Sequence, residues 1–309
     1  MGIVVIGSVF VDIKGYPEEQ FIPQGRNAGK VIQVHGGVCR NVVEDIANIE
    51  LRPTFISLVD DDSIGEDVIR HLDQHKVDTR YVRKVQDGMG IWLAVFDNNG
   101  DVAASVSKRP DLYEIGRIVQ EHGEEIFPNA DSIIVEIDMK GELLKPVFAF
   151  AEKYHKQVYA VVSNMSIALK RRDLIKKTGC FVCNQREAGL LFMEDYDNLE
   201  PDQLLEMIKK RAADAKIRRM VVTMGARGAV YASEDGEYGY CPAPKVNVVD
   251  TTGAGDAFFS GIAIGLTYGK SLKVSCEIGT RLASSVIITK ESVCPRFMPE
   301  EFDLRGVTE

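Results

Sequence analysis

The chain has 309 residues, of which 45% are hydrophobic and 27% charged, with a formal net charge of −9. This length allows one large α/β domain or two smaller ones, and the ordinary composition excludes disorder over most of the chain. The acidic balance argues against nucleic-acid binding, and no apolar run approaches the ~18 residues of a membrane span. Because neither a signal-peptide pattern nor a disulfide framework is present, we expect a cytoplasmic protein.

The first apolar segment, residues 1–7, predicts a buried strand that ends near Gly7. Asp12 follows a few residues beyond it, at the edge of an open parallel sheet where ligands collect. We therefore predict that Asp12 contacts a substrate, and a plain surface turn is the alternative. Residues 13–35 are irregular, with Pro17 and Pro23 breaking short apolar pieces, and are predicted to be part of a small lid.

Gly36 and Gly37 precede an apolar helical run over residues 42–49. Two glycines before a helix let the backbone approach a ligand, and Asn41 can offer a donor and an acceptor to a diol. We predict that all three bind substrate.

A strand over residues 54–59 and a helix from Ser63 to about His75 follow. His71 and His75 share one face of this helix at i, i+4. The sequence identifies no further metal ligand beside them, so a partly exposed helix face is the prediction.

Two β-rich runs, 90–96 and 102–106, flank Asp97-Asn98-Asn99-Gly100 and predict a hairpin. Together with residues 13–35, the segment 89–108 is assigned to a β lid. Trp92, the only tryptophan of the chain, lies on it. Substrate or partner contact and simple packing within the lid are both compatible with this position.

Strands and helices then alternate, which implies βαβ crossovers and a parallel sheet covered on both faces. The predicted elements are a helix from about Asp111, a strand 132–137, a helix 142–155, a strand 157–162, a helix near 167–177 and, later, a helix of about 272–288. Cys180 and Cys183, separated by apolar residues, predict a buried strand rather than a zinc site.

Asn184 and Glu187 end that strand as Asn-x-x-Glu, a pattern that also suits the cap of a helix. Farther along, Thr223, Gly225 and Gly228 form a strand–turn–strand segment. Neither pattern is specific by itself.

Residues 250–258 read Asp-Thr-Thr-Gly-Ala-Gly-Asp-Ala-Phe and deliver the N-terminus of an apolar helix. We expect Gly253 and Gly255 to allow positive φ, so that N–H groups converge where the helix dipole favours a phosphate. A carboxylate beside such an anion site needs a function. For Asp256 the plausible function is to take a proton from a hydroxyl that attacks phosphorus.

The nonapeptide 250–258 resembles the C-terminal signature of the PfkB, or ribokinase-like, family of sugar and nucleoside kinases. Gly36-Gly37 with Asn41, Asn-x-x-Glu and the Thr-x-Gly turn resemble further family motifs, in family order. The resemblance implies one ribokinase-like domain over 1–309, a three-layer α/β/α fold with a mainly parallel sheet and a small β lid. It implies these roles: Asp256 as base; Gly253, Ala254 and Gly255 as anion hole; Asp12, Gly36, Gly37, Asn41 and Trp92 for substrate; Asn184, Thr223, Gly225, Gly228 and Thr252 for nucleotide.

The resemblance also implies ATP with Mg²⁺, which Glu187 positions through water. In some relatives a monovalent cation such as K⁺ binds a loop equivalent to that of Ser292 and Cys294. A homodimer through the lid is implied as well. Phe10 and Ser163 stand where the family usually has Asn and Asp.

The segments 27–30, 36–41 and 97–100 resemble pseudouridine kinases, which favours pseudouridine as the acceptor of phosphate on a hydroxymethyl group. The alternatives are a free-sugar kinase of the ribokinase or fructokinase type and a non-catalytic sugar- or nucleoside-binding regulator. A dinucleotide-dependent oxidoreductase is disfavoured because no Gly-x-Gly-x-x-Gly follows the first strand.

Overall fold

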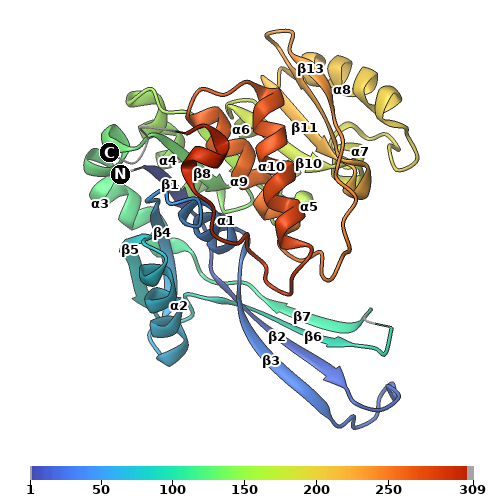
Figure 1. The fold of residues 1–309 in the computed structure, drawn as a ribbon. Coiled ribbons are helices and arrows are strands. Elements are labelled where there is room, and N and C mark those ends of the chain that lie inside the picture. The colour runs from blue at the N-terminus through green and yellow to red at the C-terminus, as the bar shows by residue number, and fades with distance from the viewer. Residues whose placement is uncertain (1, 100, 305–309) are drawn as a thin grey trace.

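The computed structural model describes residues 2–99 and 101–304, and these are built around one large twisted sheet (Figure 1). Its nine strands run in the order β13-β12-β11-β10-β9-β8-β1-β4-β5. All neighbours from β5 to β11 are parallel, whereas β12 and β13 are antiparallel additions at one edge. The strands are β1 Ile3–Ile6, β4 Thr54–Asp60, β5 Asp78–Val85, β8 Ser132–Glu136, β9 Val158–Val161, β10 Cys180–Asn184, β11 Arg219–Thr223, β12 Ala229–Ser233 and β13 Tyr238–Cys241.

Helices cover both faces of the sheet, because successive strand side chains point to opposite sides. In β1, Ile3 and Val5 belong to one core, and Val4 and Ile6 belong to the other. The first core includes α1 Val38–Ala47, α2 Ser63–Gln74, α9 Ala254–Thr267 and α10 Leu272–Val286. The second includes α3 Tyr113–Asn129, α4 Gly141–Lys153, α5 Met165–Ala168, α6 Arg172–Ile175, α7 Gln185–Phe192 and α8 Pro201–Ala215.

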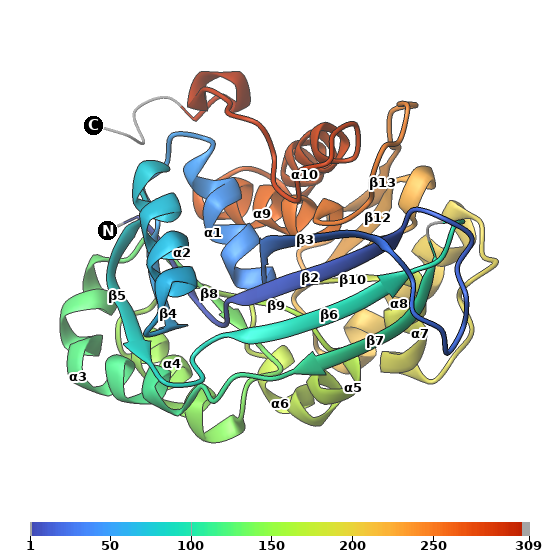
Figure 2. The same cartoon turned by 90° about the horizontal axis from the view of Figure 1, so that it is seen from below.

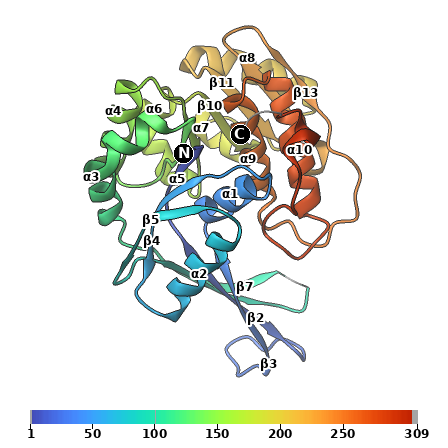
Figure 3. The same ribbon diagram turned by 60° about the vertical axis from the view of Figure 1, so that its left-hand side comes forward.

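A second, four-stranded sheet projects from this layered body (Figure 3), and its strands lie side by side in the view from below (Figure 2). Its order is β3-β2-β6-β7, with β2 Phe10–Pro17, β3 Gly29–Gly36, β6 Gly90–Phe96 and β7 Val102–Lys108. β2 leaves the carboxyl side of β1 after a short connection, so this sheet begins where a ligand of the main sheet would lie. We refer to these four strands as the lid sheet.

The predicted three-layer α/β fold with a mainly parallel sheet is confirmed, and several boundaries are corrected. Of residues 13–35, expected to be irregular, 13–17 belong to β2 and 29–35 to β3, whereas Pro17 ends β2 and Pro23 lies in the connection between the two strands. The helix expected from residue 42 begins at Val38, and β5 was not predicted.

The helix expected near 167–177 is broken into α5, a 3₁₀ turn over Leu169–Arg171, and α6. The hairpin 90–96 with 102–106 is present as β6 and β7, although Gly100 of its turn, like Met1, lies outside the described residues. Among the described residues, no helix is both long and apolar enough to cross a membrane.

Candidate active site

Asp256 lies in the first turn of α9 and contacts a side chain from the other end of the chain. One oxygen of its carboxylate accepts a hydrogen bond of 2.7 Å from the Nδ2 of Asn41 on α1. The two helices pack against each other in the core, which holds this pair together. Burial raises the pKa of Asp256 to about 6, against the opposing effects of the Asn41 hydrogen bond and the positive charge of Arg40.

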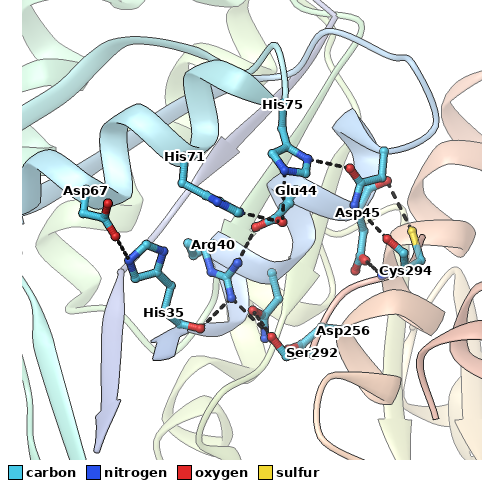
Figure 4. A network of polar contacts seen from close by, with 12 residues as sticks. His35, Arg40, Glu44, Asp45, Asp67, His71, His75, Asp256, Ser292 and Cys294 are labelled. Carbon is cyan, nitrogen blue, oxygen red and sulfur yellow. Dashed lines mark hydrogen bonds and ion pairs between the residues drawn. The ribbon is translucent and has the colours of Figure 1, made fainter. Parts of the chain in front are cut away.

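Arg40 extends this network toward the C-terminal part of the chain (Figure 4). Its guanidinium donates to the carbonyl oxygen of His35 at 2.6 Å and to Ser292 Oγ at 3.3 Å. Ser292 Oγ in turn lies 3.4 Å from Asn41 Oδ1. The segment around Ser292 therefore braces the two residues that position Asp256.

Gly253 and Gly255, which precede Asp256, differ in backbone conformation and in what surrounds them. Gly253 has φ of +80° and caps α9, and a Cβ atom there would lie 1.8 Å from the carbonyl oxygen of Ser292. Gly255 instead lies inside α9, so the expectation of a positive φ at this position was wrong. A Cβ atom on Gly255 would meet nothing within 4 Å, which leaves open space above the first turn of the helix.

A cavity of about 610 Å³ opens between the main sheet and the lid sheet, and Asp256 lines it. The predicted substrate residues Asp12, Gly37, Asn41 and Trp92 line the same cavity. Asp12 and Trp92 are register partners on β2 and β6, so their side chains share one face of the lid sheet. Five of the candidate residues, separated by more than two hundred positions, thus meet around one space.

Gly36 contacts this site indirectly, through Asp12. A Cβ atom on Gly36 would lie 2.7 Å from a carboxylate oxygen of Asp12, and one on Gly37 would lie 2.8 Å from the backbone N of Phe10. Only glycines let β2 and β3 close in this way. Burial raises the pKa of Asp12, against the attraction of Lys14 and Arg40.

Sequence reasoning missed an acidic wall of the cavity, made by Glu136, the last residue of β8, and by Asp138 just beyond it. Ser163 bridges the two, donating to Glu136 Oε1 at 3.0 Å or to Asp138 Oδ2 at 2.7 Å. Ser8 donates to the other oxygen of Glu136 from both its backbone N and its hydroxyl, at 2.8 and 2.7 Å. Burial, and then the nearby Asp138, raise the pKa of Glu136.

The position of Glu136 and Asp138 in the sequence could have predicted that they belong to the site. A carboxylate at the carboxyl end of a buried parallel strand lies on the edge where ligands bind. Ser163, which departs from the family pattern, follows the neighbouring strand β9 and holds both carboxylates. Phe10, the other departure, and Arg109 also line the cavity.

The residues expected to bind nucleotide do not line this cavity. Asn184 and Thr223 are register partners at the carboxyl ends of β10 and β11, while Gly225 and Gly228 follow with φ of +57° and +94°. Thr252 lines a separate pocket of about 680 Å³ that also includes Lys14 and Lys290. The candidate residues thus lie in three places: the cavity of Asp256, the carboxyl ends of β10 and β11, and the pocket of Thr252.

Asn184 and Glu187 form a capping box at the start of α7. Asn184 Oδ1 accepts from the backbone N of Glu187, and Glu187 Oε2 accepts from the backbone N of Asn184, both at 2.9 Å. Burial raises the pKa of Glu187. Its second carboxylate oxygen can still orient a water, which is how a hydrated Mg²⁺ is usually held.

The arrangement around Asp256 suits proton abstraction from a bound hydroxyl. A carboxylate whose pKa is raised to about 6 is mostly ionised at neutral pH and is an effective general base, and the adjacent helix N-terminus favours a phosphoryl group. Carboxylates and an amide in the same cavity can orient a polyhydroxylated substrate.

The chain is similar to named kinases over most of its length. The chain is similar to a guanosine-inosine kinase of Exiguobacterium acetylicum, with 32% identity over 307 residues, covering 97% of this chain and 98% of the relative. A pseudouridine kinase of Escherichia coli is 26% identical over 269 residues, covering 84% and 82%. The structure of Arabidopsis thaliana ribokinase complexed with ribose and ATP shares the fold, with a TM-score of 0.81 at 19% identity over 98% of each chain. Residues 2–299 match the description "pfkB family carbohydrate kinase", and the chain belongs to that family.

Proposed function

We propose that this protein transfers the γ-phosphate of ATP to a hydroxymethyl group of a nucleoside. The observation that carries the proposal is that Asp256 faces one cavity together with Asp12 and Asn41. Asp12 and Asn41 would hold sugar hydroxyls, and Asp256 would take the proton of the attacking hydroxyl. Backbone N–H groups of residues 253–255 would stabilise the phosphoryl group in transit.

On the nucleotide side, Asn184 and Glu187 would orient Mg²⁺ through water, and Thr223, Gly225, Gly228 and Thr252 would contact ATP. The bound ion would neutralise charge on the phosphate oxygens. A monovalent cation near Ser292 belongs to the same proposal, supported by the approach of the Ser292 carbonyl oxygen to Gly253. The six free, buried cysteines support a reducing compartment such as the cytoplasm.

For the acceptor we favour a purine nucleoside of the guanosine or inosine type. Support comes from the full-length similarity to a guanosine-inosine kinase and from the cavity, where the aromatic rings of Phe10 and Trp92 can pack on a base. Pseudouridine is the second candidate, supported by its own relative at 26% identity and by the sequence segments that resemble pseudouridine kinases.

Formation of ADP from Mg-ATP, with each acceptor supplied separately, tests the proposal. Guanosine and inosine should be used with a higher kcat/KM than pseudouridine, ribose or fructose. A preference for pseudouridine would replace the purine assignment and keep the nucleoside kinase. Preference for a free sugar would refute the nucleoside, and no acceptor-dependent ADP formation would favour a non-catalytic binding protein.

We also propose that the lid sheet mediates a homodimer. The face opposite Asp12 and Trp92 carries an apolar row in which the partly buried Ile13 pairs with Leu93, and Leu93 pairs with Val106. Leu93 is 43% exposed and Val106 is 68% exposed. An exposed apolar sheet face of this kind is typical of a protein interface.

A further inference from the structure

Three metal-ligating side chains converge between α1 and α2, outside the cavity that holds Asp256 (Figure 4). His71 lies in the last turn of α2 and His75 caps its C-terminus, with ring centroids 4.6 Å apart. Glu44 reaches them from α1, and one ligand atom from each residue lies within 4.8 Å of the others. Glu44 supplies a third candidate ligand atom, which the spacing of the two histidines alone did not indicate.

The two oxygens of Glu44 have separate partners. Oε2 pairs with the guanidinium of Arg40. Oε1 lies 2.9 Å from His71 Nε2 and 3.9 Å from His75 Nε2. The side chain of Glu44 is 3% exposed, so its negative charge is shielded from bulk water and lies beside the two imidazoles.

His75 is held in the tautomer that a metal ligand needs. Asn48 Nδ2 donates to the carbonyl oxygen of Cys294 at 2.7 Å, which fixes the orientation of the Asn48 amide. Asn48 Oδ1 therefore accepts from His75 Nδ1 at 2.7 Å, and in the neutral ring Nε2 keeps its lone pair. A histidine that ligates a metal usually donates its other N–H in this manner.

The spacing also suits a small tetrahedral ion. Bonds of about 2.0–2.1 Å to such an ion place its ligand atoms about 3.3 Å apart. The two distances from Glu44 Oε1, 2.9 and 3.9 Å, lie on either side of that value. His71 and His75 are 37% and 33% exposed and line a pocket of about 500 Å³, so an ion can enter and keep a water ligand.

We propose that Glu44, His71 and His75 form a binding site for a divalent transition metal ion such as Zn²⁺, with water as the fourth ligand. Two imidazoles favour Zn²⁺ or Co²⁺ over Mg²⁺, which prefers oxygen ligands. Glu44 and His71 also line the pocket of Thr252, but the site uses none of the residues proposed to hold the Mg²⁺ that accompanies ATP. It does not depend on the identity of the phosphate acceptor.

The test is Co²⁺ binding to the full chain after treatment with a chelator, followed by visible absorption and by competition with Zn²⁺. One Co²⁺ per chain with a tetrahedral spectrum is expected, displaced by one equivalent of Zn²⁺. His71→Asn and His75→Asn should each raise the dissociation constant at least tenfold, and the double variant should abolish binding. His122→Asn, on α3, is the matched control and should bind as the wild type does.

The histidine variants carry the test because their side chains are partly exposed, whereas Glu44→Gln would leave Arg40 without its buried partner and endanger folding. Circular dichroism of each variant checks that the fold is kept. No Co²⁺ spectrum in the wild type, or full binding by the double variant, would overturn the site. An absorption band of thiolate-to-Co²⁺ charge transfer would do the same, because it would place the ion on cysteine.

Discussion

At the scale of single residues, the candidate site depends on one partly buried carboxylate whose ionisation is set by its neighbours. Loss of solvation at Asp256 favours its neutral form, while Asn41 and Arg40 favour the ionised form. The balance places its pKa near the range in which a general base is most effective. This balance can be tested by removing either the carboxylate or a partner.

Asp256→Asn keeps the shape of the side chain and removes the base. We expect kcat to fall by about 10²–10⁴, the usual effect of losing a general base, while ATP and nucleoside still bind. Steady-state ADP formation measures the rate, and fluorescence of Trp92, the only tryptophan, reports nucleoside binding in the cavity. The exposed Asp202→Asn on α8 is the control, and near-normal turnover by Asp256→Asn would remove the residue from its role.

The pH dependence of kcat/KM should show the same carboxylate. Because only the ionised form accepts a proton, kcat/KM should fall about tenfold per unit as pH decreases below about 6, the pKa of Asp256 in the free protein. Asn41→Ala removes a hydrogen bond that stabilises the ionised form, so the midpoint should move to higher pH. Asn129→Ala, at the end of α3, should leave it in place. A midpoint that stays fixed in Asn41→Ala would contradict the assignment.

At the scale of elements, the N-terminus of α9 is held against the segment around Ser292, and the helix starts where that contact is tightest. Gly253 closes the contact through its missing side chain and its positive φ. Gly255 lies two residues farther on in regular helix with open space beside it. Gly253 therefore contributes to the stability of the fold, whereas Gly255 leaves space for a ligand to approach.

Alanine at each glycine should have different effects. Gly253→Ala adds a Cβ atom 1.8 Å from a carbonyl oxygen at a φ of +80°, so we expect at least about 1 kcal/mol less stability together with lost activity. Gly255→Ala should leave stability unchanged or raise it by about 0.4–1 kcal/mol, yet lower kcat because the methyl group occupies the space for the phosphoryl group. Urea unfolding and ADP formation measure both. Equal stability of the two variants, or full activity of Gly255→Ala, would contradict this division.

At the scale of the whole molecule, the sequence predicted those features of the fold that a local residue pattern encodes. Strand–helix alternation predicted the layered sheet, and the motif around Asp256 predicted a loop that opens a helix. β5 and the lid strands β2 and β3 were missed because half-exposed strands lack a continuous apolar run and depend on pairing with distant partners.

The same reason explains which site residues escaped prediction. Asp12, Asn41 and Asp256 lie in motifs, whereas Glu136 and Asp138 have no flanking pattern and become part of the site only when β8 and β9 lie side by side. Glu44 likewise joins His71 and His75 only after α1 and α2 pack on the same sheet face.

The outer face of the lid sheet gives the last prediction, because strand alternation fixes which residues face away from the cavity. Lys14 and Ala94, partners on the inner face, are 9% and 1% exposed, whereas Leu93 and Val106 on the outer face are 43% and 68% exposed. If two copies pair through this face, Leu93→Asp with Val106→Lys should yield a monomer by light scattering after size exclusion, with unfolding in urea unchanged for the layered body. Val249→Lys, at a valine outside the lid sheet that is 55% exposed, should leave the mass at that of the dimer. A monomeric wild type, or a dimer that survives the double substitution, would show that this face does not mediate a dimer.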